Sequence, residues 1–224
     1  DAVAYVLRCF EDSDVTHVEG RIDPLADAET VETELMLADL DSLEKRKAGV
    51  EKKAKGGDKE AKAQVGLIDK AIAMLAAGKP ARALALTEEE KPPFRLLQLL
   101  TAKPVVYVAN VEEAAAATGN AHSRSVEAAA EKEGAAAVVI SAKIEAELAA
   151  LAPDEQADYL ASLGLAEPGL DRLIRVGHTL LGLITYFTAG PKEARAWTIP
   201  RGTRAPKAAG VIHTDFEKGF IRAE

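Results

Sequence analysis

The sequence is poor in cysteine, in aromatic residues and in long apolar runs. Its 224 residues include a single cysteine, Cys9, which excludes an internal disulfide framework and indicates a reducing cytosol. We interpret Cys9 as a small buried residue of a strand. Aromatic residues make up only 4% of the chain, so the core must be built mainly from Ala, Leu and Val. No signal peptide, lipidation motif or apolar run of membrane length is visible, and we expect a cytoplasmic protein without membrane contact.

Two apolar runs end in polar residues that suit a ligand. Residues 105–108 (Val-Val-Tyr-Val) are too continuously apolar for a half-exposed strand and predict a buried parallel strand. The run ends at Asn110, and Glu113 follows three residues later. A second apolar run, Ala135 to Ile140, leads into residues 141–143 (Ser-Ala-Lys). Because ligands of open α/β sheets bind at the carboxyl ends of the strands, these ends predict a rim that reads a purine edge.

The spacing of apolar residues changes to a helical pattern from Asp27 to about Leu100. Gly56-Gly57-Asp58 interrupts this pattern, which predicts an antiparallel helical hairpin whose second arm ends at residues 78–80. Each arm carries four apolar residues with the spacing of a short antiparallel coiled coil. These residues are Met36, Leu40, Leu43 and Val50 on the first arm, and Val65, Ile68, Ile72 and Leu75 on the second.

The tip of the predicted hairpin is basic although the formal net charge of the chain is −8. One interpretation is a solvated helix surface with ion pairs such as Glu51 to Lys55. The other is a basic finger that contacts the phosphate backbone of RNA; without an aromatic residue, it would be insensitive to sequence and sensitive to salt. The basic residues of the tip are Lys45, Arg46, Lys47, Lys52, Lys53, Lys55, Lys59 and Lys62.

The last third of the sequence predicts three helices and then a different module. The helices should begin near Ile144, Pro153 and Pro168. From Leu183 two strand-like runs and the turn residues 200–202 predict a β-hairpin, followed by a short helix at 205–212 and a strand start at 219–223.

This last module carries a second basic group that could contact RNA or a ribosomal protein. The segment His213-Thr214-Asp215 lacks a third ligand at suitable spacing, so we expect no metal site and interpret it as a hydrogen-bonded turn. The basic group consists of Arg195, Arg201, Arg204 and Lys207.

Eight segments that follow one another along nearly the whole chain resemble the YchF family, the Obg-like ATPases. Runs of this extent are stronger evidence than any four-residue motif. The segments are RCFED (8–12), HVEGRIDP (17–24), TELMLADLDSLEKR (33–46), LLTAKPVVYVANVEE (99–113), ISAKIEAELA (140–149), EPGLDRLIR (167–175), LLGLITYFTAG (180–190) and RAWTIPRGTRAPKAAGVIHTDFEKGFIRAE (195–224).

The resemblance implies an α/β fold with an incomplete parallel sheet of the P-loop NTPase type. An antiparallel coiled-coil hairpin would interrupt this sheet, and an incomplete ubiquitin-like β-grasp module, the TGS domain, would follow it. The implied domains are 1–26 with 101–181 for the nucleotide-binding unit, 27–100 for the hairpin and 182–224 for the TGS module. The family is cytosolic and associated with ribosomes, so the resemblance implies the ribosome or its RNA as partner.

The resemblance also implies roles for the strand ends. GTPases carry Asn-Lys-x-Asp where the YchF family carries Asn-x-x-Glu, and this chain has Asn110, Val111 and Glu113 at these positions. The longer carboxylate and the replacement of Lys by Val111 should weaken guanine selection, because a carboxylate placed for guanine faces a lone pair on adenine. Asn110 would hold the base, Glu113 would influence purine choice, and residues Ser141, Ala142 and Lys143 would form the opposite wall. Without the resemblance, Asn110 is more simply a loop cap and Glu113 a solvated acid.

The sequence contains neither a G-x-x-x-x-G-K-[ST] loop nor the Asp-x-x-Gly segment that follows it in this class. We therefore expect a central and C-terminal part of a longer protein, which alone does not hydrolyse nucleotide. The cofactor would be ATP or GTP, with Mg²⁺ held by residues outside this chain. Two functions remain open: a nucleotide-switched NTPase with ribosome-facing modules, or an interaction module that binds RNA or the ribosome without turnover.

Overall fold

A computed structural model describes residues 1–11 and 22–222. Most of the HVEGRIDP segment therefore lies outside the described residues. Three strands form a parallel sheet in the order β1 (Val3–Arg8), β2 (Val105–Asn110) and β3 (Ala136–Ile140). β2 is the central strand and is buried along nearly its whole length, as its continuous apolar run predicts. The register pairs Arg8 with Asn110 and Asn110 with Ile140, so the three carboxyl ends meet at one edge.

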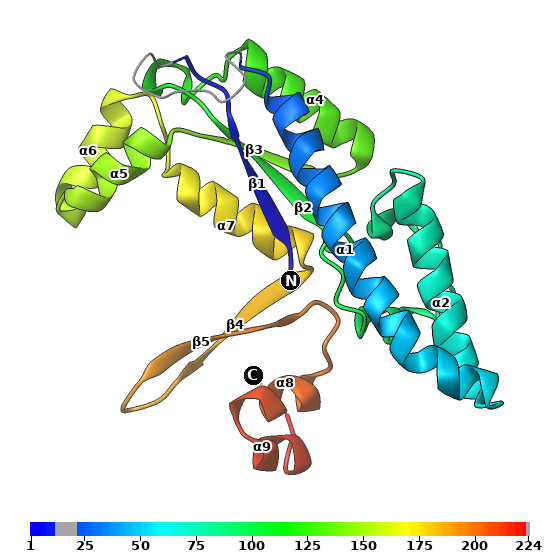
Figure 1. Cartoon of the computed structure of the whole chain (residues 1–224). Coiled ribbons are helices and arrows are strands. Elements are labelled where there is room, and N and C mark those ends of the chain that lie inside the picture. Colours follow the sequence, from blue (N-terminus) through cyan, green and yellow to red (C-terminus); the bar gives the residue numbers. More distant parts are fainter. Residues whose placement is uncertain (12–21, 223–224) are drawn as a thin grey trace.

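Helices cover both faces of this sheet (Figure 1). On one face, Tyr5, Tyr107 and their alternate neighbours pack against Ala28 of α1 (Pro24–Lys55) and Val126 of α4 (Ala121–Glu133). On the other face lies α7 (Gly169–Leu180), and a Cβ added at Gly169 would lie 2.9 Å from Ile140. This close approach explains why glycine begins α7.

The predicted helical hairpin is formed by α1 and α2 (Lys59–Ala76). The turn between them needs Gly57, whose φ is +98°, and Asp58 caps α2 by accepting hydrogen bonds from two backbone N–H groups. Of the eight predicted seam residues, Met36, Leu43, Ile68 and Leu75 are buried, and the other four, including Val50 and Val65 near the tip, are half-buried. Each fully buried aliphatic side chain stabilises the fold by ~1.5 to 3 kcal/mol, so the hairpin is held mainly at its base.

The segment between the hairpin and β2 was not predicted in detail. It forms a 3-10 turn η1 (Ala81–Ala83) and a short helix α3 (Lys91–Arg95). Phe94, Leu97 and Leu99 from this segment join the core at the base of the hairpin. The hairpin therefore has a hydrophobic core of its own, distinct from that of the sheet.

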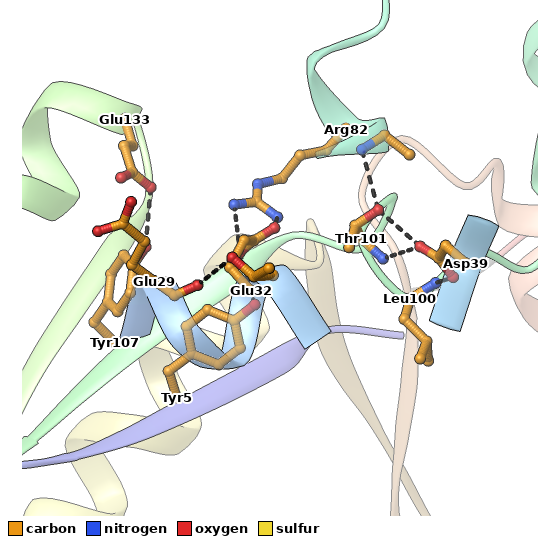
Figure 2. Close-up of polar contacts among 11 residues, drawn as sticks. Tyr5, Glu29, Glu32, Asp39, Arg82, Leu100, Thr101, Tyr107 and Glu133 are labelled. Carbon is orange, nitrogen blue, oxygen red and sulfur yellow. Dashed lines mark hydrogen bonds and ion pairs between the residues drawn. The ribbon is translucent and has the colours of Figure 1, made fainter. Parts of the chain in front are cut away.

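Two carboxylates of α1, one buried and one half-buried, fasten the hairpin to the sheet (Figure 2). Asp39 is 3% exposed and accepts hydrogen bonds from the backbone N–H groups of Leu100 and Thr101, both at 2.8 Å, and from the Thr101 hydroxyl at 2.7 Å. Glu32 accepts two hydrogen bonds from the Arg82 guanidinium, at 2.8 and 3.0 Å, and one from the Tyr5 hydroxyl at 2.7 Å. Because Leu100 and Thr101 lead into β2, the hairpin is tied to the strand that ends at Asn110.

The remaining elements follow the predicted order. Helices begin near all three predicted starts, and a β-hairpin follows them. Helix α8 has the predicted bounds. No helix of the described residues is long and apolar enough to cross a membrane. These elements are α5 (Ala142–Ala150), α6 (Pro153–Ser162), β4 (Leu183–Ala189), β5 (Ala194–Pro200), α8 (Ala205–Ile212) and α9 (Thr214–Lys218).

The strand start predicted at 219–223 is wrong for the described residues 219–222, which form no strand. The chain instead forms α9, whose first turn is capped by His213: its Nδ1 accepts a hydrogen bond from the backbone N–H of Asp215 at 3.2 Å. This contact confirms the hydrogen-bonded turn predicted for residues 213–215. A strand also needs a neighbouring strand, and β4 and β5 pair only with each other among the strands described.

Candidate functional site

The carboxyl ends of β2 and β3 bring the predicted rim residues together. β2 ends at Asn110, and β3 leads through Ser141 directly into α5. The backbone N–H of Val111 donates to the carbonyl of Ile140 at 2.8 Å, which continues the parallel pairing one residue beyond Asn110. The rim is thus fixed by sheet pairing rather than by loop conformation.

Asn110 joins three segments of the rim. Its side-chain Oδ1 accepts a hydrogen bond from the backbone N–H of Ala142 at 2.9 Å, and its backbone carbonyl accepts one from Cys9 at 2.8 Å. The first contact satisfies an N–H at the start of α5, which a helix cannot pair internally. The amide Nδ2 of Asn110 remains as a donor, and purine bases of either kind present the N7 acceptor to such a donor.

Glu113 and Lys143 form an ion pair across the rim. Lys143 Nζ lies 2.6 Å from Glu113 Oε2, and the two side chains are 68% and 38% exposed, respectively. Glu113 begins the 3-10 turn η2 (Glu113–Ala115), and Lys143 lies in the first turn of α5. An exposed pair of this kind is worth only about 0 to 1 kcal/mol, so a ligand can displace either partner at low cost.

Ser141 carries a buried polar atom beside this pair. The residue is 3% exposed, and its Oγ has no hydrogen-bond partner among the described residues. Although Ser141 occupies the N-cap position of α5, its side chain makes no capping bond. A buried hydroxyl without a partner costs free energy, and such groups are typical of functional sites.

Val111 occupies a different environment from the one expected for a residue that faces a base. Its side chain is 2% exposed and packs in the core of the sheet with Val126 and Ala109. Only its backbone lies at the rim. The position occupied by Lys in GTPases thus contributes no side chain to the ligand side here.

Asn120 is a rim residue that the sequence interpretation missed. Its Nδ2 donates to the backbone carbonyl of Cys9 at 2.5 Å and to Glu112 Oε2 at 2.9 Å. Its Oδ1 caps α4 in a reciprocal arrangement with Ser123. The spacing Asn-x-x-Ser before an apolar helix face was the available signal, but it predicts only the cap.

Cys9 is fully buried, as predicted, but it lies one residue beyond the end of β1 rather than within a strand. Burial, with a smaller contribution from the negative charge of Glu112, raises the pKa of the Cys9 thiol to about 12. The thiol is therefore protonated at neutral pH and is unsuited to nucleophilic chemistry.

The basic residues of the hairpin tip fall into two groups. Three of them form ion pairs within the hairpin: Lys45 with Asp41, Lys47 with Asp69, and Lys55 with Glu51, the last as predicted. Arg46 donates to the backbone carbonyl of Leu96. The four lysines for which no acidic partner lies within 4 Å among the described residues are Lys52, Lys53, Lys59 and Lys62.

The second basic group lies on the C-terminal module, away from the hairpin tip (Figure 1). Arg195 stacks on the Trp197 ring at 4.2 Å from its centroid, and Lys207 pairs with Glu217 at 2.5 Å. Arg201 and Arg204 are exposed at the turn before α8. The structure thus does not gather the two basic groups into one patch.

Comparisons with known proteins identify the family of the chain. The family model YchF-GTPase_C, described as a protein of unknown function, matches residues 183–224. Over 224 residues the chain is 50% identical to the ribosome-binding ATPase YchF of Escherichia coli O157:H7, covering all of this chain and 61% of that protein. It is 46% identical to the ribosome-binding ATPase YchF of Bacillus subtilis strain 168 over 226 residues, covering 62% of that protein.

A solved structure shares the architecture. The Schizosaccharomyces pombe YchF GTPase matches with a TM-score of 0.83 and 33% sequence identity over 99% of this chain and 61% of that one. The fold is therefore that of a mixed α/β protein with a three-stranded parallel sheet and a separate antiparallel pair, as in this GTPase. The chain belongs to the YchF family, and it spans about 61% of the length of these curated relatives.

Proposed function

We propose that the intact protein hydrolyses a purine nucleoside triphosphate and that this chain supplies its base-binding part. The observation that carries the proposal is the junction at the ends of β2 and β3, where Asn110 binds Ala142 and Glu113 pairs with Lys143. The relatives named above are a ribosome-binding ATPase and a GTPase, which supports a nucleotide as ligand. The rim binds and orients the base and does not itself react.

The domains in this proposal follow the elements. Residues 1–26 and 101–181 form the nucleotide-binding unit, and residues 27–100 form an antiparallel coiled-coil insertion. Residues 182–224 form the first part of a TGS module. The separate cores of the sheet and the hairpin support this division.

The rim fits a purine base on two grounds. Asn110 retains an amide donor for the N7 acceptor that adenine and guanine share, and the Oγ of Ser141 is a buried polar atom without a partner among the described residues. Guanine selection needs a carboxylate that accepts from two adjacent N–H donors. Lys143 already occupies one oxygen of Glu113. The rim should therefore bind ATP at least as well as GTP.

Bound nucleotide would bring Mg²⁺ with it to neutralise the phosphates. Within residues 1–11 and 22–222 no three His, Cys, Asp or Glu side chains are grouped to hold a metal ion. We assign the metal and phosphate ligands to residues of the intact protein beyond this chain, and no chemical step is placed on residues described here.

The ribosome or its RNA is the proposed partner, and the protein would act in the cytoplasm. Lys59 lies at the first position of α2, where the helix dipole makes a positive charge unfavourable, so helix stability does not account for it. Together with Lys52, Lys53 and Lys62 it places four positive charges at the hairpin tip. Lys45, Arg46, Lys47 and Lys55 would contribute less, because each is already engaged. Arg201, Arg204 and Lys207 would form a second contact.

A second candidate function is an RNA- or ribosome-binding module without nucleotide turnover. The four tip lysines favour this function, because they could bind RNA whether or not the rim holds a nucleotide. The two functions differ in whether the rim binds a base at all.

Competitive ATP and GTP binding to the full-length protein tests the first function. Asn110→Asp keeps an acceptor for the Ala142 N–H but removes the amide donor, and it should weaken both nucleotides by roughly tenfold, the equivalent of one hydrogen bond to the base. The control is Gln64→Glu, the same chemical change at an exposed position of α2. Equal affinities for wild type and Asn110→Asp would reject the base site and leave the interaction module.

A further inference from the structure

The strand β3 has one open edge among the described residues, because it pairs only with β2. The carbonyl of Ile140 accepts from the Val111 N–H at 2.8 Å, so Ile140 and its alternate neighbours direct their backbone groups toward β2. The backbone N–H and C=O groups of Ala137 and Val139 therefore face the opposite way. Such an edge is a template on which another extended segment can pair.

A groove of about 390 Å³ runs along this edge. One wall comes from α7 and carries Arg172 and Arg175, and the other comes from α4 and carries Glu127. Ala137 and Val139 form the floor, and the end of the groove is closed by residues 116–119. The two walls stand on opposite faces of the sheet (Figure 1).

Two arginines of α7 share one carboxylate in the groove, that of Glu167. Glu167 binds Arg175 through both of its carboxylate oxygens, and these hydrogen bonds lower the pKa of Glu167. The Nε of Arg172 is buried and has no hydrogen-bond partner among the described residues. A guanidinium N–H in this position needs an acceptor, and a carboxylate gives the strongest bond.

We propose that an extended peptide segment of a partner protein adds to the open edge of β3, with an acidic side chain bound to Arg172. Side chains of an added strand alternate between the two faces of the sheet. If one side chain faces α7 and Arg172, the next faces α4 and Glu127. The partner segment therefore carries an acidic residue next to a basic one within a run of strand-forming residues.

The open edge of β1 does not have these features. There the side chain of Val6, whose backbone groups face outward, is 66% exposed rather than enclosed between charged walls. A second copy of the chain fits the groove of β3 less well than a peptide does. If two copies paired through β3 about a twofold axis, α7 of one copy would lie beside α7 of the other, and α4 beside α4. The second copy would therefore offer Arg172 no acidic residue from its α4.

The probe is a fluorescent eight-residue peptide of alternating threonine and valine, with adjacent aspartate and lysine at its centre. It is titrated into the full-length protein, and hydrogen exchange of the backbone amides is followed. We expect binding to slow the exchange of the Ala137 and Val139 amides at least tenfold. Arg172→Gln should weaken the affinity about tenfold, equivalent to about 1.4 kcal/mol.

Three controls make the outcome decisive. A peptide with asparagine and glutamine at its centre should bind more weakly and show no difference between wild type and Arg172→Gln. A peptide methylated on alternate backbone nitrogens should not bind in the register that pairs with β3. Arg124→Gln, at an exposed position of α4, should leave all affinities unchanged.

Several results would overturn the proposal. The charged peptide could fail to bind, or it could slow hydrogen exchange at amides other than those of β3. Arg172→Gln could also weaken the affinity of the charged and uncharged peptides equally. Protection of Ala137 and Val139 without any peptide would also overturn it, because another part of the protein or a second copy would then cover the edge.

Discussion

Substitutions in the Glu113–Lys143 ion pair should alter the preference between ATP and GTP with little effect on the fold. Both side chains are exposed, so neither contributes to the core. The carboxylate of Glu113 can select guanine only when it is not engaged by Lys143. The affinity ratio of GTP to ATP should therefore depend on this pair more than on any buried residue of the rim.

Lys143→Met should raise GTP competition against ATP in the full-length protein. The change removes the cation but keeps an apolar stem, so Glu113 becomes able to accept from guanine, with a gain of about 1 kcal/mol or fivefold. Glu113→Asp should also raise the affinity ratio of GTP to ATP, because the shorter side chain loses its ion pair with Lys143 and restores the aspartate found in GTPases. Competitive binding measures both, and Lys132→Met on α4 is the control. Unchanged ratios in both variants would remove Glu113 from base selection.

Cys9 should react slowly with thiol reagents in the native protein. Burial raises the pKa of the Cys9 thiol from 9.0 to about 12, so almost no thiolate exists at pH 8. The unfolded chain ionises first, so the contribution of Cys9 to stability is complete below pH 9 and is lost as the pH rises toward 12. Labelling at pH 8 in the presence and absence of urea measures the difference. Equal labelling rates would contradict the buried position.

The helical hairpin is joined to the sheet by buried and half-buried polar contacts as well as by apolar packing. Asp39 and Glu32 lie on the same helix and bind Thr101 and Arg82, which flank the segment that leads into β2. Burial lowers the pKa of Arg82, but its hydrogen bonds to Glu32 and the charge of that residue outweigh this effect, so the pKa is raised overall. The orientation of the hairpin is thus coupled to the strand that presents Asn110.

Asp39→Ala should destabilise the protein by about 2 to 4 kcal/mol, because it leaves buried N–H groups of Leu100 and Thr101 without an acceptor. Urea unfolding measures the loss. The control is Asp41→Ala on the same helix, whose ion pair with Lys45 is exposed and should be worth at most about 0.5 kcal/mol. Similar losses in both variants would show that Asp39 does not act as a clamp.

Positive charge is distributed unevenly across the chain, and the hairpin tip is its most basic part. The net charge of −8 opposes general attraction to RNA, so binding there must be local and short in range. The tip also lies far from the sheet and its rim (Figure 1). A partner held at the tip therefore leaves the rim accessible.

Replacing Lys52, Lys53, Lys59 and Lys62 by Gln should weaken ribosome binding and reduce its dependence on salt. Each phosphate contact contributes about 0.7 to 0.9 to the slope of log affinity against log salt, so the four changes should lower that slope by about 3. Sedimentation with ribosomes at several salt concentrations measures it. Replacing Lys45, Lys47 and Lys55, which are already paired, should have a smaller effect per residue. Equal effects per residue in the two sets of variants would contradict a specific role of the four lysines in ribosome binding.

Local patterns were sufficient to predict most elements. The apolar run of β2, the hairpin turn at residues 56–58 and the starts of α6 and α7 depend on neighbours in sequence, and the structure has them close to the predicted positions. The prediction of a strand near residue 219 was wrong, because a strand requires a neighbouring strand, which short-range sequence patterns do not specify.

Chain order and residue spacing thus placed Asn110 and residues 141–143 at the ends of two parallel strands. They left open which side chains reach the rim. Only folding showed that Val111 points into the core and that Lys143 meets Glu113. It also showed that Asp39 and the Nε atom of Arg172 are buried. The physical reason is that backbone periodicity depends on adjacent residues, whereas burial and hydrogen bonding depend on segments brought together from 30 or more residues apart, as with Asp39 and Thr101.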